Sequence, residues 1–341
     1  MRTIRNEIQN NSRKKIHILA TGGTIAGKGK NAADLTDYKA GELTVDELIA
    51  SVPNLPDFAE ITAENFCQIA SEDMTTDIWL NLAKRVNAIL QNTDIDGVVI
   101  THGTDTMAET AYFLNLTCPS SKPVVLTGAM LPATAENPDG TQNLADAVAL
   151  AACGDAADNN VMVVMNGSFF AADSVRKIHS SALWAFADPC RGRLGCIEKD
   201  GVYFEQVILQ NTVFFDIDAA EKLPSVDILT AYADLPPQLP QALLNMGRRN
   251  IIFDCFGNGT LPKPVVDLLN SAEGIFISTT QTGGGLAVRT YPNVIKGLGL
   301  TAKQARIVLM LLLAENSAKG KVTEQKQIAE IIKKLSDALQ P

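Results

Sequence analysis

The chain has 341 residues, 46% hydrophobic and 20% charged, which is long enough for two domains with buried cores. The formal net charge is −9, and no Lys/Arg cluster is longer than Arg13-Lys14-Lys15. These features argue against nucleic acid as a partner, because phosphate binding needs a basic face. The apolar run over residues 307–314 is far shorter than the roughly 18 residues that suggest a membrane span, so we expect no membrane partner.

Residues 1–14 are polar and have no apolar signal core, which predicts a disordered leader and a cytoplasmic protein. A periplasmic location is the alternative if a signal peptide has already been removed. The six cysteines include no C-x-x-C pair and no histidine at ligand spacing. We therefore expect no metal and no cofactor.

Strand-like and helix-like patterns alternate from residue 15 to about residue 165, which predicts a mostly parallel sheet flanked by helices. The expected strands are 15–21, 66–70, 97–101, 123–127 and 161–166. The expected helices are 45–51, 76–91, 106–116 and 142–152. The first helix has a capping box, in which Thr44 is followed three residues later by Glu47.

A second, smaller α/β unit follows a segment without helical periodicity. Its expected strands are 225–233, 250–256 and 274–279, and its expected helices are 238–246, 264–272, 301–315 and 323–339. The prediction is thus a two-domain α/β protein. It has an N-terminal catalytic domain over 15–205, a linker over 206–223 and a C-terminal domain over 224–341.

Two threonines follow strands of the first domain. Thr24 lies in a glycine-rich turn after the strand over 15–21, and Thr104 lies in a similar turn after the strand over 97–101. Because crossovers between parallel strands are right-handed, both turns should open on one edge of the sheet. Ser71-Glu72-Asp73 and the segment 127–129 should reach the same edge.

A hydroxyl needs a base or an acidified environment to act as a nucleophile, and Thr104, Asp105 and Lys177 are candidates to supply one. The glycines, among them Gly23, allow backbone N–H groups to approach a substrate and form an oxyanion hole. Structural alternatives stay open. The glycine turn could be purely structural or cradle a phosphate, Thr104-Asp105 and Ser71-Glu72-Asp73 could cap helices, and Lys177 could be a surface lysine.

Five motifs together resemble the bacterial-type L-asparaginase family, which includes glutaminase-asparaginases. They are ATGGTIAG over 20–27, IASEDM over 69–74, THGTDTMAETAYFL over 101–114, PVVLTGAMLP over 123–132 and VMVVMNG over 161–167. The resemblance extends from about residue 15 to residue 315. It implies an amidohydrolase that converts L-asparagine, and less readily L-glutamine, through an acyl intermediate on a threonine.

The resemblance also implies residue roles. Thr24 matches the nucleophile, and Thr104, Asp105 and Lys177 match the second catalytic group. Tyr38 matches a tyrosine of a mobile lid, whose preceding part is residues 28–34. The implied substrate-binding residues are Gly23, Ser71, Glu72, Thr104, Asp105 and Asn258.

The resemblance further implies a homotetramer built from intimate dimers, in which Asn258 completes the site of a neighbouring subunit. A second partner residue of the family, a glutamate, has no match here, because the chain is shorter at that place and contains Gln281–Ala287. Two other functions stay open. One is an ammonia-donating amidotransferase subunit, and the other is an inactive module that binds aspartate or asparagine.

Overall fold

The computed structural model describes residues 13–31, 38–52, 55, 59–206 and 212–339. Most of the predicted leader, residues 1–12, lies outside this range, and so do residues 207–211 of the predicted linker. The chain divides into two compact units, Met1–Phe214 and Phe215–Pro341. Each unit is an α/β structure in its own right.

The first unit contains an eight-stranded sheet in the order β12-β11-β8-β7-β6-β5-β1-β4. Its parallel part consists of β4 (Ala59–Ile69), β1 (Lys14–Gly22), β5 (Gly97–Thr101), β6 (Val124–Thr127) and β7 (Val161–Met165). Three antiparallel strands extend it, namely β8 (Ser168–Ala171), β11 (Gly195–Glu198) and β12 (Gly201–Phe204). The predicted mostly parallel sheet is confirmed, whereas these three antiparallel strands were not predicted.

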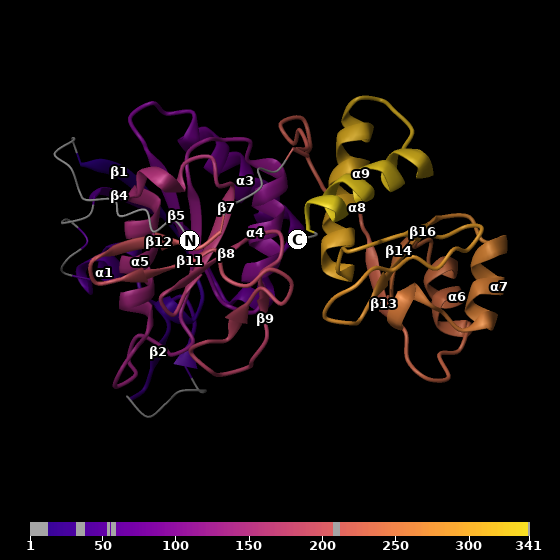
Figure 1. Ribbon diagram of the computed structural model, residues 1–341, viewed down its shortest axis with the longest axis horizontal. Helices are drawn as coiled ribbons and strands as arrows, with labels where there is room; N and C mark the ends of the chain where they lie inside the picture. The colour runs from indigo at the N-terminus through magenta and orange to yellow at the C-terminus, as the bar shows by residue number, and fades with distance from the viewer. Residues whose placement is uncertain (1–12, 32–37, 53–54, 56–58, 207–211, 340–341) are drawn as a thin grey trace. The chain divides into compact units, whose positions relative to one another are not determined.

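Helices cover both faces of this sheet (Figure 1). The helices α1 (Val45–Ala50) and α5 (Gly140–Ala152) pack on one face, and α3 (Thr76–Leu90) and α4 (Met107–Thr117) pack on the other. The capping box of α1 is present, with the Thr44 side chain accepting from the Glu47 backbone. All four helices lie within about two residues of their expected bounds.

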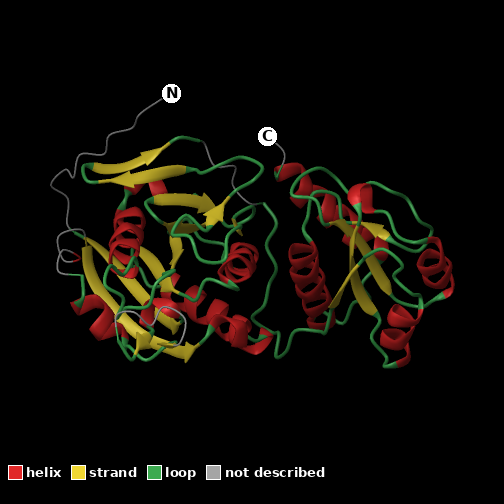
Figure 2. Cartoon of the chain, turned by 90° about the horizontal axis from the view of Figure 1, so that it is seen from below, coloured by secondary structure: helices red, strands yellow, loops and turns green. Residues whose placement is uncertain are grey.

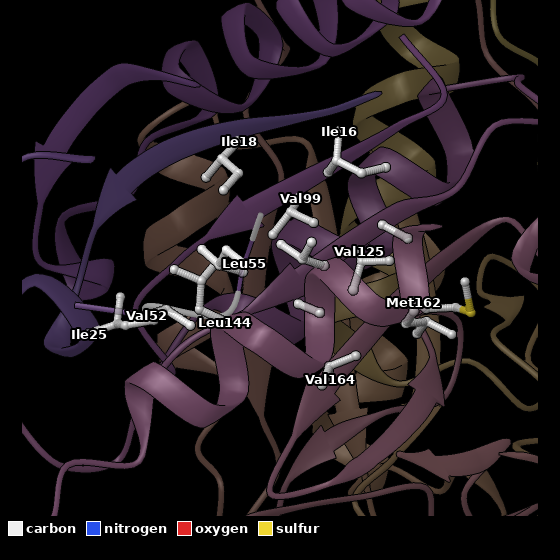
Figure 3. Packing of buried hydrophobic residues seen from close by; sticks show 14 of the residues in the cluster. Ile16, Ile18, Ile25, Val52, Leu55, Val99, Val125, Leu144, Met162 and Val164 are labelled. Carbon is white, nitrogen blue, oxygen red and sulfur yellow. The ribbon is translucent and has the colours of Figure 1, made fainter. Parts of the chain in front are cut away.

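The core on the α1–α5 side follows the two-residue period of the strands. Ile18, Val99 and Leu144 project into this cluster from β1, β5 and α5 (Figure 3). Residues of alternate register, such as Leu19 and Ile100, are also fully buried and face the α3–α4 layer. A sheet buried on both faces explains why its strands are continuous apolar runs.

The strand β4 begins at Ala59, seven residues before the expected start at residue 66. Its sequence AEITAENFCQI alternates apolar and polar residues, and its burial also alternates along much of its length. This edge strand is half-exposed, so its pattern differs from the buried strands that defined the expected elements. The neighbouring strand β1 pairs with it in parallel from Lys14 onward.

The second unit has a four-stranded parallel sheet in the order β13-β14-β15-β16. These strands are β13 (Asp227–Thr230), β14 (Asn250–Cys255), β15 (Ile275–Thr280) and β16 (Ile295–Lys296). The helices are α6 (Gln238–Asn245), α7 (Lys263–Ser271), α8 (Ala302–Ala318) and α9 (Gln325–Ala338), and they lie on both sides of the sheet (Figure 2). The apolar run over 307–314 lies in α8, and all of its residues except Leu313 are buried. In the described part of the chain, none of the helices combines the length and apolarity needed to cross a bilayer.

Candidate active site

The strand order of the first unit reverses at the carboxyl ends of β1 and β5. From β1 the chain moves outward to β4, and it then returns to the other side of β1 to form β5. The crossovers on the two sides of β1 therefore lie on opposite faces of the sheet, so the turns that follow β1 and β5 flank a topological switch point. Ligands of open α/β sheets bind at such switch points.

The turn after β1 is built from glycines that no other residue could replace without strain. Gly22 and Gly23 have φ angles of 100° and 79°. A Cβ added to Gly23 would lie 2.3 Å from the Gly103 backbone nitrogen, so the two turns touch through bare backbone. The Gly23 N–H donates to the Ile69 carbonyl at the end of β4 (2.8 Å). Thr24 follows at once as the first residue of the 3-10 helix η1 (Thr24–Ala26), and it is half-buried.

The turn after β5 is joined to the turn after β4 through Ser71. Ser71 is buried and opens the short 3-10 helix η2 (Ser71–Asp73). Its Oγ accepts a hydrogen bond from the Asp105 N–H (3.1 Å), and its carbonyl accepts one from the Thr106 hydroxyl (2.8 Å). Glu72, the next residue, is exposed.

Lys177 reaches this edge from a segment 72 residues farther along the chain. It lies in β9 (Arg176–Lys177), which pairs with β10 (Phe186–Ala187). Its Nζ donates to Thr104 Oγ1 at 2.8 Å and to Asp105 Oδ1 at 2.6 Å. The Lys177 side chain is 20% exposed and that of Asp105 is 59% exposed, so the pair has one sheltered member and one at the surface.

A partly buried polar cluster that sequence reasoning missed is formed by residues that flank β9 and β10 in the sequence. Asp188 accepts hydrogen bonds from the backbone N–H groups of Cys190 (2.8 Å) and Arg191 (3.0 Å). The Ser174 hydroxyl also bonds to Asp188, and the Arg191 guanidinium contacts Asp173. These partners lie up to 18 residues apart, on either side of β9 and β10 in the sequence, so no local sequence pattern links them.

The other two predicted residues, Tyr38 and Asn258, lie in other elements of the chain than the Thr104–Lys177–Asp105 group. The Tyr38 backbone lies in β3 (Tyr38–Lys39), opposite Gly29 of β2 (Lys28–Gly29), while its side chain and lid residues 32–34 lie outside the described part. Asn258 belongs to the second unit, in the turn η4 (Gly257–Gly259). Its Oδ1 accepts a hydrogen bond from the Val288 N–H (3.3 Å), and the residue is exposed.

No group of three or more His, Cys, Asp or Glu side chains is arranged to hold a metal ion within the described ranges. The histidine nearest the two turns, His102, is fully buried, and burial lowers its pKa to about 4. Its imidazole is therefore neutral at physiological pH. The arrangement can present hydroxyls, a cation and bare backbone to a small polar molecule.

Two family models account for most of the chain. The asparaginase N-terminal model matches residues 15–209, and the glutaminase/asparaginase C-terminal domain model matches residues 225–325. The chain belongs to the asparaginase family. The resemblance seen in the sequence motifs is thereby confirmed.

Individual relatives agree with this membership. The asparaginase-family chain is 39% identical over 313 residues to a probable periplasmic L-asparaginase of Haemophilus influenzae, covering 88% of each chain. It is 37% identical over 312 residues to a glutaminase-asparaginase of Pseudomonas fluorescens biotype A, covering 87% of this chain and 86% of the relative. A crystal structure of a probable cytoplasmic L-asparaginase from Campylobacter jejuni matches with a TM-score of 0.87 and 38% identity, covering 94% of this chain and all of the other.

Proposed function

We propose that this protein is an amidohydrolase that converts L-asparagine to L-aspartate and ammonia through an acyl intermediate on Thr24. The observation that supports this most is the Lys177 Nζ held between Thr104 Oγ1 and Asp105 Oδ1, at 2.8 Å and 2.6 Å. This group of three lies beside the glycine turn that carries Thr24. It provides a hydrogen-bonded chain able to accept and return a proton.

The proposed reaction has two halves. In the first, the Thr24 oxygen attacks the side-chain amide carbon while its hydroxyl proton passes to the Thr104–Lys177–Asp105 chain. The same chain returns this proton to the amide nitrogen, the C–N bond breaks and ammonia leaves. In the second, water attacks the ester carbon, the Thr24 hydroxyl is restored and L-aspartate leaves. The Thr104 N–H faces no acceptor among the described residues, so it is free to stabilise the oxyanion of both halves.

We assign the α-amino and α-carboxylate groups of the substrate to the acidic and polar residues beside this chain. Asp105 and Glu72 expose carboxylates that attract an ammonium group, and Ser71 keeps a hydroxyl hydrogen that can be donated to a carboxylate. Gly23 lets the backbone approach the substrate closely. L-Glutamine is the proposed second substrate.

We further propose a homotetramer of intimate dimers, in which Asn258 of one subunit completes the site of a neighbouring subunit, while Tyr38 belongs to the lid of its own subunit's site. The support is the family membership and the exposed position of Asn258 in a left-handed turn, with a φ angle of 62°. A fully active monomer, identified by light scattering with activity assays, would exclude this sharing. Localisation stays a prediction, because one relative is named periplasmic and another cytoplasmic.

Steady-state hydrolysis of L-asparagine and L-glutamine by the purified protein tests the function. We expect a higher kcat/KM for asparagine. Thr24→Ala should lower kcat by at least about 10³-fold in a protein that still folds, because it removes the proposed nucleophile. Thr104→Ala should act similarly. An active Thr24→Ala enzyme would refute the nucleophile, and aspartate binding without turnover in the native protein would favour a sensing module.

A further inference from the structure

A buried chain of hydrogen bonds runs beneath the turn that carries Thr104. The Trp79 Nε1–H of α3 donates to Thr110 Oγ1 of α4 at 2.9 Å. Thr110 Oγ1 lies 3.0 Å from His102 Nε2, and His102 Nδ1 lies 2.7 Å from the Gly103 carbonyl oxygen. Thr110 and His102 are fully buried, and Trp79 is 4% exposed.

The Gly103 carbonyl oxygen, the last acceptor, determines which atom donates in each hydrogen bond of the network. A carbonyl oxygen can only accept, so His102 Nδ1 must carry the proton. Burial lowers the pKa of this imidazole to about 4, so the ring has one proton and its Nε2 is an acceptor. Thr110 therefore donates its hydroxyl hydrogen to His102 and accepts from Trp79. Every member of the chain has a partner.

The last hydrogen bond of this network, from His102 to the Gly103 carbonyl, determines the orientation of the Gly103–Thr104 peptide group. In a trans peptide, the C=O and the following N–H point in opposite directions. The Gly103 carbonyl is held toward the His102 ring, in the layer of α3 and α4, so the Thr104 N–H points away from that layer. This N–H has no acceptor within the described ranges, although Thr104 is only 5% exposed.

We propose that His102 is a positioning residue for the hydrolysis, and that Trp79 and Thr110 hold it in the Nδ1–H tautomer that aims the Thr104 N–H at the substrate oxyanion. The inference rests on the function proposed above and adds residues that do not touch the substrate. Its physical basis is that an oxyanion donor acts only when it is oriented before charge develops. A second conformation of this peptide would need a new partner for the buried Gly103 carbonyl.

Nitrogen NMR of histidine-labelled native protein tests the tautomer directly. The chain has three histidines, so few ring signals need assignment. At pH 7 we expect His102 to show a protonated Nδ1 and an unprotonated Nε2. A ring protonated at Nε2, or a charged ring, would overturn the inference whether or not any variant folds.

Kinetics of a near-isosteric variant test the role. Thr110→Val keeps the side-chain shape and removes the hydroxyl, so we expect kcat for asparagine to fall about 10-fold while KM changes less than about twofold. Thr110→Ser restores the hydroxyl and should recover kcat to within about threefold of native. If Thr110 were only structural, the loss and recovery of kcat in Thr110→Val and Thr110→Ser would follow their melting temperatures. A change in kcat between two variants that melt at similar temperatures therefore supports the positioning role.

Thr117→Val is the matched control. Thr117 is also a fully buried threonine of α4, and its hydroxyl donates to the Phe113 carbonyl (2.8 Å) away from His102. We expect native kcat in this control. A native kcat in folded Thr110→Val overturns only the positioning role, whereas a native protein without asparagine turnover overturns the proposed function as well.

Discussion

The two units contain the same kind of sheet, yet they differ in strand order. In the second unit the strands β13 to β16 lie side by side in chain order, so the sheet never reverses direction. In the first unit the order β4-β1-β5 contains a reversal, and the turns that carry Thr24 and Thr104 follow β1 and β5 at this reversal. Strand order, more than strand composition, therefore decides which sheet edge can hold a ligand.

The turns at the two sheet edges also differ. Both η1 and η4 follow a parallel strand. Gly23, which precedes η1, and Gly259, which lies in η4, have positive φ angles. In the first unit the turns after β1 and β5 meet closely, and Thr104 and Asp105 of the turn after β5 accept hydrogen bonds from Lys177. In the second unit the Asn258 side chain bonds to the nearby Val288 backbone. The same local turn chemistry thus serves two different roles.

The two units each contain a lysine–aspartate pair with the same separation. Lys177 and Asp105 in the first unit, and Lys263 and Asp267 in the second, are both separated by 2.6 Å. Lys177→Met should lower kcat about 10²–10³-fold, because it removes the link between Thr104 and Asp105.

Lys263→Met is the control for that change. The Lys263 side chain is 84% exposed, so its removal should change the free energy of unfolding by less than about 0.5 kcal/mol and leave kcat unchanged. Steady-state assays and denaturant titrations measure both effects. Equal kinetic losses in the two variants would contradict the assignment of the site to the first unit.

Two glycines of nearly equal φ angle provide the next test. Gly23 has a φ of 79° and Gly247 has a φ of 78°. A Cβ at Gly23 would lie 2.3 Å from the Gly103 nitrogen, whereas a Cβ at Gly247 would meet nothing within 4 Å. Gly23→Ala should therefore destabilise the fold by about 2–4 kcal/mol and reduce turnover, since the two turns must move apart.

Gly247→Ala introduces only an unfavourable backbone angle. We therefore expect the free energy of unfolding to fall by about 1 kcal/mol and kcat and KM to stay native. Chemical denaturation measures both variants. Similar stability losses would show that close packing of the two turns is not what requires glycine.

The stability of the two units should also depend differently on pH, because only the first unit contains histidines. Burial lowers the pKa of His102 to about 4 and also lowers that of His17, while residues 215–341 contain no histidine. Between pH 6.5 and 4 the unfolded first unit takes up protons that the folded unit does not, so its free energy of unfolding falls by up to about 3 kcal/mol from His102 alone. Calorimetry at several pH values measures this, and His102→Gln should remove the contribution of His102 to the slope. An unchanged slope in this variant would rule out His102 as the cause.

Most of the parallel sheet could be predicted from apolar runs and caps. The strand over 97–101 was predicted with its observed bounds, and the α1 capping box was read directly from Thr44 and Glu47. The hairpin of β7 and β8 was missed although its signal is present. Asn166 and Gly167 have φ angles of 51° and 68° and form a turn of the kind that Asn-Gly pairs favour.

The sequence by itself determined the family, the alternation of strands and helices, and the glycines that leave room for close backbone approach, because these depend on local conformation and short motifs. Only the tertiary structure decided that Lys177 reaches Thr104 and that His102 supports the Gly103 carbonyl. Those contacts join strand ends, a distant β9–β10 pair and two helices. Their distances depend on how the sheet is ordered and covered, which no short segment of the chain specifies.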